Sequence, residues 1–252
     1  MIPLDDRGLL LGDGLFETIL WSEGQLEHLD AHAKRLARGC KALGLPPPDP
    51  DALETAALDA VDAAGLHADR AAVRLTWTAG SGGRGLDRPE LPAPRLFASA
   101  AASPAPSTPA RLATVAVRRN EGSPASRHKT LNYLDNVLAR REARTSGADE
   151  ALMFNNRGEV AGGAAANLFW FEGDTLLTPA LECGVLDGVM RGLVIDRAAR
   201  LGIAVHEVTA TDLEGATGVF LTNSLIGVRP VHSIDGAPVI AHSAVRRLSS
   251  AT

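Results

Sequence analysis

One lysine in this chain is placed differently from the other two. Among 25 basic residues, only Lys34, Lys41 and Lys129 are lysine. A lysine that forms an imine cannot be exchanged for arginine, because a guanidinium stays protonated and is not an amine nucleophile. Lys34 and Lys41 fall on the polar side of a helical pattern, so we expect them at the surface. Lys129 lies in a separate segment and is the candidate nucleophile.

Familiar sites for nucleotides, metals and serine catalysis are missing from the sequence. The glycine-rich run 80–85 follows a predicted strand but has no lysine at its end, so it is not a nucleotide phosphate loop. No GxSxG motif marks a hydrolase serine. His28 and His32 are four residues apart, but without an HExxH motif they predict packing or surface histidines and no metal site. Cys40 and Cys183 are predicted to be small buried residues without a disulfide.

The composition excludes several classes of partner. The chain has 252 residues, 45% of them hydrophobic, and a formal net charge of −5. Because there are no basic runs, this charge argues against a nucleic-acid or membrane surface. No stretch of 18 apolar residues occurs, and the N-terminal segment lacks the basic start and apolar run of a signal peptide. We therefore expect a folded cytoplasmic protein.

The elements that must position these residues fall into two halves. The first half has strand patterns at 15–20, 72–78 and 95–101 and helical patterns at 28–43 and 51–64. These predict a small α/β domain over residues 1–100. The segment 101–110 is rich in proline and small residues and has no periodicity, as expected for a linker.

The second half, 111–252, alternates short strands with a few helices. Strands are predicted at 111–118, 151–154, 167–170, 175–178, 203–208, 218–223 and 228–234, and helices at 131–145, 188–201 and 242–250. Lys129 is expected at the mouth of the first of these helices, where a surface lysine would oppose the helix dipole. The whole pattern indicates an α+β protein with a larger, β-rich C-terminal domain.

Seven segments, taken in order and spacing, resemble the class IV family of pyridoxal-phosphate enzymes. They lie between Asp5 and about Ile240 and read GDGLFET (12–18), HAKRL (32–36), HKTLNYLDNVLARREA (128–143), ANLFW (166–170), LTP (177–179), GVLDGVMR (184–191) and FLTNSLIGVRPV (220–231). The family includes branched-chain and D-amino-acid transaminases and aminodeoxychorismate lyase. The resemblance implies a homodimer in which each chain has a small N-terminal α/β domain, a larger C-terminal domain and pyridoxal 5′-phosphate between them.

The resemblance also implies roles for individual residues. Lys129 becomes the Schiff-base lysine and, after substrate exchange, the base at the substrate Cα. Arg35 of HAKRL and Ser224 of TNSL would hold the cofactor phosphate, which is a dianion. The main-chain amides of Val189 and Met190, at a predicted helix N-terminus, would hold it as well.

Two further residues have open interpretations. Tyr133 lies four residues after Lys129, so one helical turn could place its hydroxyl near the cofactor ring, and packing is an equal alternative. Arg84, in the glycine-rich loop, is the candidate cation for the carboxylates of an amino substrate. A solvated loop arginine is the equal alternative for that residue.

One position departs from the family pattern. Members usually read V-[TS]-E-G-x-x-x-N before the strand asparagine, whereas this chain reads VAGGAAAN, with Gly162 in place of the glutamate. That carboxylate normally pairs with the pyridine nitrogen and keeps it protonated, so its loss predicts a weaker electron sink. Glu159 lies three residues earlier and points to the opposite face of a strand, so it is not an obvious substitute. If Gly162 is an emptied carboxylate site, Gly162→Glu should raise turnover; if the backbone is crowded there, turnover should fall.

Three segments favour one reaction within the family. GSGGRG (80–85), ANLFW (166–170) and TNSLIGVRPV (222–231) resemble aminodeoxychorismate lyase more closely than the transaminases. Such an enzyme removes a proton from 4-amino-4-deoxychorismate and expels pyruvate, which leaves 4-aminobenzoate, a folate precursor. The alternatives are a D-amino-acid or branched-chain transaminase, and a cofactor-binding relative with little or no turnover because of Gly162.

Overall fold

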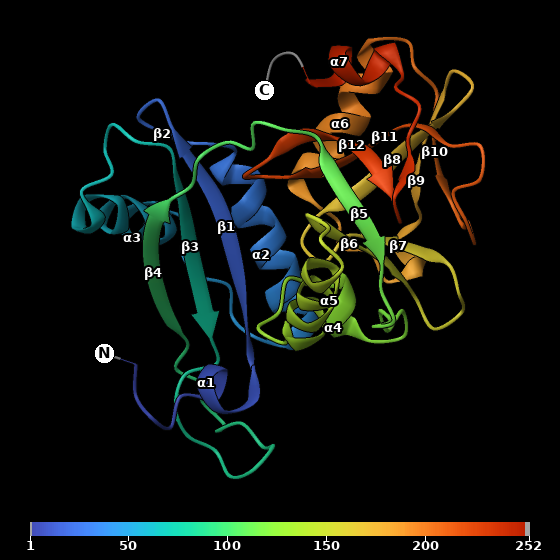
Figure 1. Ribbon diagram of the computed structural model, residues 1–252. Helices are drawn as coiled ribbons and strands as arrows, with labels where there is room; N and C mark the ends of the chain where they lie inside the picture. Colours follow the sequence, from blue (N-terminus) through green and yellow to red (C-terminus); the bar gives the residue numbers. More distant parts are fainter. Residues whose placement is uncertain (1, 250–252) are drawn as a thin grey trace. The chain divides into compact units, whose positions relative to one another are not determined.

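Two β-sheets divide the chain into two units (Figure 1). The computed structural model describes residues 2–249. The first unit contains residues 2–105 together with His128–Asn132, and the second contains residues 106–127 and 133–249. Both units combine helices with a sheet, which confirms the predicted α+β class.

A four-stranded antiparallel sheet forms the first unit, in the order β2-β1-β3-β4. Its strands are β1 (Gly14–Ser22), β2 (Gln25–Leu26), β3 (Ala71–Thr78) and β4 (Arg95–Ala102). Glu23 and Gly24 connect β1 to β2, and both have positive φ, as in the type I′ turns whose twist matches that of a hairpin. A short helix, α1 (Arg7–Leu11), precedes β1.

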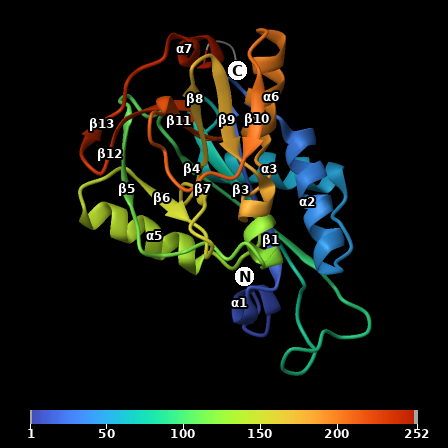
Figure 2. The ribbon, with the colours of Figure 1, turned by 90° about the vertical axis from the view of Figure 1, so that its right-hand side faces the viewer.

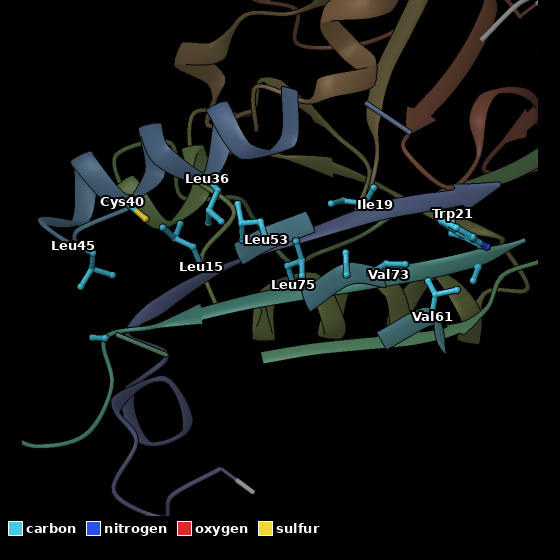
Figure 3. Close-up of a cluster of buried hydrophobic side chains, with 13 residues drawn as sticks. Leu15, Ile19, Trp21, Leu36, Cys40, Leu45, Leu53, Val61, Val73 and Leu75 are labelled. Carbon is cyan, nitrogen blue, oxygen red and sulfur yellow. The ribbon is translucent and has the colours of Figure 1, made fainter. Parts of the chain in front are cut away.

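Two helices, α2 (Leu29–Leu43) and α3 (Pro50–Ala64), pack on this sheet. α3 begins where the Asp49 side chain accepts a hydrogen bond from the amide of Asp51, and Pro50 occupies the first helical position. Both helices end at a glycine in the left-handed conformation. The core between helices and strands, shown in Figure 3, includes Leu15, Ile19, Leu36, Cys40, Leu53, Val61, Val73 and Leu75.

The second unit is built on a nine-stranded mixed sheet with the order β10-β9-β8-β11-β12-β5-β6-β7, and β13 pairs with β12. The strands are β5 (Ala110–Thr114), β6 (Glu150–Phe154), β7 (Val160–Gly162), β8 (Asn167–Glu172), β9 (Thr175–Pro179), β10 (Val205–Val208), β11 (Thr217–Asn223), β12 (Gly227–Ile234) and β13 (Ala237–Pro238). β7, at one end of this order, also contacts β8 and β9, so the sheet curls back on itself.

Helices cover the second sheet from different sides. They are α4 (Pro124–Arg127), α5 (Leu134–Thr145), α6 (Val189–Arg200) and α7 (Ser243–Ser249), with a short 3₁₀ turn, η1 (Leu181–Cys183). α5 packs on β5 and β6 through small residues, among them Ala139 and Ala143. α6 and α7 pack against the aromatic side chains of β8 and β11, and Figure 2 shows α6 running along β10. In the part of the chain that is described, no helix has the length and hydropathy of a membrane span.

Several boundaries differ from the predicted ones. The division after Ala105 lies within the predicted linker 101–110, but the first two residues of that segment belong to β4 and the last to β5. The strand predicted at 111–118 ends at Thr114, and the helix predicted at 131–145 begins only at Leu134. Residues 128–132, predicted in the C-terminal domain, group with the first unit. The helix predicted at 242–250 is α7, and residue 250 lies outside the described residues.

Candidate functional site

Lys129 lies on a segment that extends the sheet of the first unit. The amide of Phe16 donates a hydrogen bond to the carbonyl of Lys129 (2.9 Å), and the amide of Leu131 donates to the carbonyl of Gly14 (3.0 Å). Thr130, between them, forms an antiparallel bridge with the same strand, β1. These bonds hold the segment beside β1 in a non-helical conformation. The prediction that Lys129 stands at the mouth of a helix is therefore wrong.

A phenylalanine ring and a second cation lie beside Lys129. The Nζ of Lys129 is 4.2 Å from the ring centroid of Phe16, and the guanidinium carbon of Arg74 is 3.7 Å from it. Side chains alternate along a strand, so Phe16 points away from the face of β1 that packs on α2. Lys129 is half-buried in this setting and Arg74 is exposed. The sequence analysis did not single out Arg74, because nothing in its local sequence distinguishes it from a surface arginine on a strand.

Arg35 of α2 is held by a buried carboxylate. Its Nε donates to Oε1 of Glu17 (2.9 Å), its Nη2 donates to Oε2, and Nδ1 of His32 donates to the same Oε2 (2.7 Å). The side chains of Glu17 and His32 are 2% and 1% exposed. Two parallel hydrogen bonds between a guanidinium and a carboxylate form the strongest geometry for this pair. Glu17 therefore orients Arg35 from the core side of β1.

Burial and pairing act in opposite directions on Glu17. Burial by itself raises the pKa of Glu17, but the hydrogen bonds and charge of Arg35, with a smaller contribution from His32, outweigh burial and lower the pKa to about 2. Burial, together with the charges of Arg35 and Lys129, lowers the pKa of His32 more than the Glu17 carboxylate raises it. At neutral pH the carboxylate is ionised and the imidazole is neutral, so Nδ1 carries the hydrogen that it donates.

If Arg35 holds the phosphate as predicted, its guanidinium must bind Glu17 and the phosphate at the same time. Nε and Nη2 donate to the carboxylate, so a phosphate would bind a guanidinium that Glu17 already orients. A guanidinium that is already oriented loses less conformational entropy when it binds an anion. The sequence analysis missed Glu17, although the alternation of Leu15, Glu17 and Ile19 places a charged residue on the core side of a strand.

The N-terminus of α6 offers main-chain donors without a side-chain cap. Gly188 is the N-cap residue and, having no side chain, makes no capping hydrogen bond to the first turn. The amides of Val189 and Met190 therefore have no acceptor inside the helix. A Cβ on Gly188 would stand 2.1 Å from Oδ1 of Asn167, so a larger residue here would displace the Asn167 side chain. A phosphate dianion suits such a terminus through hydrogen bonds and the helix dipole.

Ser224 lies in the turn between β11 and β12. The Asn223 side chain shapes this turn by accepting hydrogen bonds from the amides of Leu225 (2.9 Å) and Ile226 (3.0 Å). Ser224 is half-buried. On the preceding strand the buried hydroxyl of Thr222 has no hydrogen-bond partner among residues 2–249. Hydroxyl groups and helix-terminal amides are the kinds of donor that a phosphate requires, and the second unit supplies both.

Gly162 has a backbone conformation that other residues rarely adopt. Its φ is +109°, and a Cβ there would lie 3.2 Å from the carbonyl oxygen of Ala166. Any side chain at this position is strained, whatever the space around it. The interpretation of Gly162 as an emptied site that Gly162→Glu would refill is corrected, because the backbone itself requires glycine.

Arg119 and Tyr133 lie in the same part of the second unit as Gly162. Nη2 of Arg119 donates to the carbonyl of Gly163 (3.1 Å), and Tyr133 lies close to Arg119. Tyr133 is the N-cap residue of α5. No helix connects residue 129 to residue 133, so the helical-turn relation predicted between Lys129 and Tyr133 is wrong. The sequence analysis also missed Arg119, which no motif marks.

The glycine-rich loop is organised by Arg7 and presents Arg84 to solvent. Arg7 is buried, and its Nη2 and Nη1 donate to the carbonyls of Leu86 (2.8 Å) and Asp87 (2.9 Å). Its Nε donates to the carboxylate of Asp13 (2.9 Å). Arg84 is exposed on this loop. Exposure is compatible with both interpretations of Arg84, a cation for a substrate and a solvated loop residue.

The remaining predictions for single residues concern lysines, cysteines and metals. Lys34 and Lys41 are exposed, as predicted. Cys40 and Cys183 are buried and not joined by a disulfide, which confirms their predicted role. Among residues 2–249, no group of three or more His, Cys, Asp or Glu side chains could hold a metal ion.

Comparisons of the sequence and of the structure with known proteins lead to the same family. The sequence profile described as amino-transferase class IV matches residues 14–234. Aminodeoxychorismate lyase of Vibrio harveyi is 32% identical over 240 residues, which cover 92% of this chain and 87% of that protein. The structure of 4-amino-4-deoxychorismate lyase from Pseudomonas aeruginosa is similar with 33% identity, a TM-score of 0.86 and coverage of 98% and 93% of the two chains. The branched-chain aminotransferase of Thermoproteus uzoniensis with norvaline is similar with 29% identity, a TM-score of 0.89 and coverage of 99% and 87%.

Proposed function

Because the chain belongs to the class IV aminotransferase family, whose members are pyridoxal-phosphate-dependent enzymes, we propose that it is a lyase that converts 4-amino-4-deoxychorismate to 4-aminobenzoate and pyruvate. Relatives named as lyases and relatives named as branched-chain aminotransferases are about equally similar to it. The observation that carries the choice between them is the backbone at Gly162, which excludes a carboxylate.

Gly162 favours the lyase because the two reactions depend to different extents on electron withdrawal by the cofactor ring. Pyridoxal phosphate supplies an electron sink, on which a transaminase depends in each of two half-reactions. In the lyase, loss of a proton is coupled to departure of the enolpyruvyl oxygen, and the substrate ring becomes aromatic. Much of the driving force then comes from the substrate. A chain without a carboxylate at position 162 is better suited to this second reaction.

Lys129 is the reacting side chain in this proposal. Its amine would hold the cofactor covalently and, when free, would take the proton from the amine-bearing carbon of the substrate. The electrons of that C–H bond complete the aromatic ring as the C–O bond to the enolpyruvyl group breaks. The released enol takes up a proton and becomes pyruvate. The Phe16 ring beside Nζ limits the directions in which the amine can move.

Cations and main-chain donors hold the anionic groups. The phosphate is assigned to the residues predicted for it, which are Arg35, Val189, Met190 and Ser224. The substrate carries two carboxylates, and in a protein with a net charge of −5 these need local cations. Arg74, which shares the Phe16 ring with Lys129, is the first candidate, and the exposed Arg84 is the second.

A branched-chain or D-amino-acid transaminase is the second candidate function. It is motivated by the similarity to the Thermoproteus uzoniensis aminotransferase over 99% of this chain. It would use the same cofactor and the same lysine but would pass the amine to a 2-oxo acid.

One parallel assay separates the candidates. The cofactor-reconstituted chain is given 4-amino-4-deoxychorismate, and pyruvate and 4-aminobenzoate are measured; separate samples receive D-alanine or leucine with 2-oxoglutarate, and glutamate is measured. We expect equal amounts of the two lyase products and no glutamate. Lys129→Ala should abolish the reaction, and Lys34→Ala, at an exposed lysine, should not. Glutamate without 4-aminobenzoate would replace the lyase with a transaminase, and a cofactor absorbance band with no product would indicate a binding protein.

We also propose that the chain forms a homodimer. Leu9 and Leu10 of α1 are 57% and 63% exposed, and Leu134 and Val137 of α5 are 68% and 58% exposed. Exposed apolar side chains that gather on a helix favour an interface. Light scattering after size-exclusion chromatography should give twice the chain mass of 26.3 kDa. A mass of one chain at micromolar concentration would contradict the proposal.

A further inference from the structure

Arg119 has one N–H donor without an acceptor among residues 2–249. Its Nη2 donates to the carbonyl of Gly163 (3.1 Å) and lies 3.6 Å from the sulfur of Met153. Its Nε is buried and has no hydrogen-bond partner among residues 2–249. Native proteins rarely leave a buried N–H without an acceptor unless a ligand or an ordered water supplies one. Arg119 therefore indicates an acceptor that does not belong to the chain.

The carboxylates on the neighbouring strands are engaged elsewhere. Glu150 of β6 pairs with Arg140 and accepts from the amide of Ala151 (2.9 Å). Glu159, before β7, accepts from Arg157 (2.7 Å). Burial lowers the pKa of Arg119, and the negative groups around it offset this only in part. What the Nε of Arg119 lacks among residues 2–249 is an acceptor with a lone pair.

The position of Arg119 identifies the acceptor. The carbonyl that it binds belongs to Gly163, directly after Gly162, where the family carries the carboxylate that pairs with the cofactor ring nitrogen. Tyr133, predicted near the same ring, lies close to Arg119. A guanidinium therefore stands in the part of the second unit where other members of the family have a carboxylate.

We propose that Nε of Arg119 donates a hydrogen bond to the pyridine nitrogen of bound pyridoxal phosphate and holds that nitrogen unprotonated. The inference rests on the proposed binding of this cofactor. A guanidinium only donates, so its partner must offer a lone pair. A protonated pyridine has no lone pair and would place a second positive charge beside Arg119.

This contact would make Arg119 a specificity-determining residue. An unprotonated ring draws electrons less strongly than a pyridinium, so proton removal succeeds best where the substrate supplies a leaving group and an aromatic product. Transamination has neither. Arg119 and the strained glycine beside it would therefore suppress amine transfer while leaving the elimination accessible.

The first test reads the protonation of the ring directly. The chain is reconstituted with pyridoxal phosphate carrying ¹⁵N in the ring, and the ¹⁵N chemical shift is followed from pH 6 to pH 9. We expect the shift of an unprotonated pyridine throughout. The shift of a protonated pyridine at neutral pH would overturn the proposal. Failure of the cofactor to bind, or binding without attachment to Lys129, would instead overturn the proposed function, so the two failures are distinguishable.

The second test asks whether Arg119 is the partner. Equilibrium titration compares the affinity for pyridoxal phosphate with that for its 1-deaza analogue, in which C–H replaces the ring nitrogen. The unaltered chain should prefer the natural cofactor by about tenfold, as expected for one hydrogen bond to a charged donor. In Arg119→Met the preference should fall to about one. Arg118→Met is the matched control, because the neighbouring Arg118 is exposed and lies over the Phe154 ring, 5.6 Å from its centroid.

The outcomes decide the proposal even if one variant folds poorly. If the unaltered chain does not distinguish the two cofactors, the ring nitrogen has no donor and the proposal is wrong. If Arg119→Met keeps the preference, another group is the donor and the proposal is also wrong. Since the labelled-nitrogen experiment and the comparison of cofactors in the unaltered chain need no variant, each remains decisive by itself.

Discussion

Two arginines, one in each unit, meet opposite surroundings. Arg35 is bound by both carboxylate oxygens of Glu17, which also accepts a hydrogen bond from His32. Arg119 is bound by a main-chain carbonyl, and within residues 2–249 its buried Nε meets no acceptor. The first guanidinium is oriented before any ligand arrives, and the second keeps a donor for a ligand. A guanidinium bound by a carboxylate is held in a fixed orientation by the chain, and a buried N–H without an acceptor marks a place for a ligand atom.

The strands behind the two arginines show the same contrast. β1 accepts a glutamate on its core side because Arg35 and His32 bind the carboxylate there. β7 ends at Gly162, where the positive φ would strain the backbone of any residue other than glycine. In the first unit, the buried carboxylate of Glu17 is accompanied by its partners Arg35 and His32. In the second unit, the expected carboxylate is absent at Gly162, and Arg119 binds the carbonyl of the next residue.

The largest effect is expected for Lys129, the reacting group in the unit of Arg35. Lys129→Ala removes the amine, so borohydride should no longer attach the cofactor to the protein and turnover should fall by at least about 10³-fold. Mass spectrometry after borohydride treatment measures the attachment. Lys34→Ala should keep it. Cofactor found on Lys34 or Lys41 would show that Lys129 is not the reacting group.

Glu17→Ala tests whether pairing explains the first region. It leaves Arg35 and His32 buried without their common partner, so the free energy of unfolding should fall by about 3–5 kcal/mol. Urea unfolding of the apo-protein measures the change. Glu54→Ala, at an exposed position of α3, should change stability by no more than about 0.5 kcal/mol. Equal effects of the two substitutions would show that the Glu17 cluster contributes nothing special.

The Glu17 cluster also predicts a loss of stability in acid. The pKa of Glu17 falls from 4.5 to about 2 on folding, so between these values the unfolded chain binds the proton more readily. The stabilisation is present above pH 4.5 and is lost as the pH falls to about 2, with a maximum of about 3 kcal/mol. His32, whose pKa is also lowered by folding, adds a loss that begins as the pH falls below 6.5. Unfolding measured against pH should show a smaller acid slope in Glu17→Gln; an unchanged slope would contradict the prediction.

Arg35→Lys separates orientation from charge in phosphate binding. Lysine keeps the charge but cannot bind Glu17 and phosphate through one planar group. We expect the preference for pyridoxal phosphate over pyridoxal to fall by about 1.5–3 kcal/mol, and in Ser224→Ala by about 1 kcal/mol. Titration of the apo-protein with both compounds gives the ratio. An unchanged ratio in Arg35→Lys would show that the oriented guanidinium does not meet the phosphate.

The smallest expected effect concerns the strained glycine of the second region. Gly162→Ala should destabilise the chain by about 1–2 kcal/mol, because a Cβ is unfavourable at this φ. Gly192→Ala, in the interior of α6 with open space around it, should instead stabilise by about 0.5–1 kcal/mol. Thermal unfolding compares them. Changes of the same sign and size would mean that Gly162 is not under backbone strain.

Local signals predicted most of the elements. The turn at Glu23 and Gly24, the proline at the start of α3 and the glycine after it mark boundaries within a few residues of themselves. These local signals failed to predict boundaries where a distant segment of the chain forms hydrogen bonds with the same residues. The helix predicted from residue 131 starts late because residues 129–131 bond to β1, more than one hundred positions earlier, and no local pattern records that competition.

The sequence by itself determined the α+β class, the family and Lys129 as the candidate nucleophile, because periodicity, capping and motif spacing are properties of short segments. Only the tertiary structure decided that Glu17 is the partner of Arg35, that Gly162 requires glycine and that Arg119 lies beside it with an unused donor. Pairing, burial and backbone strain depend on which distant segments pack together. Their free energies therefore belong to the folded chain as a whole and have no signature in the neighbouring residues.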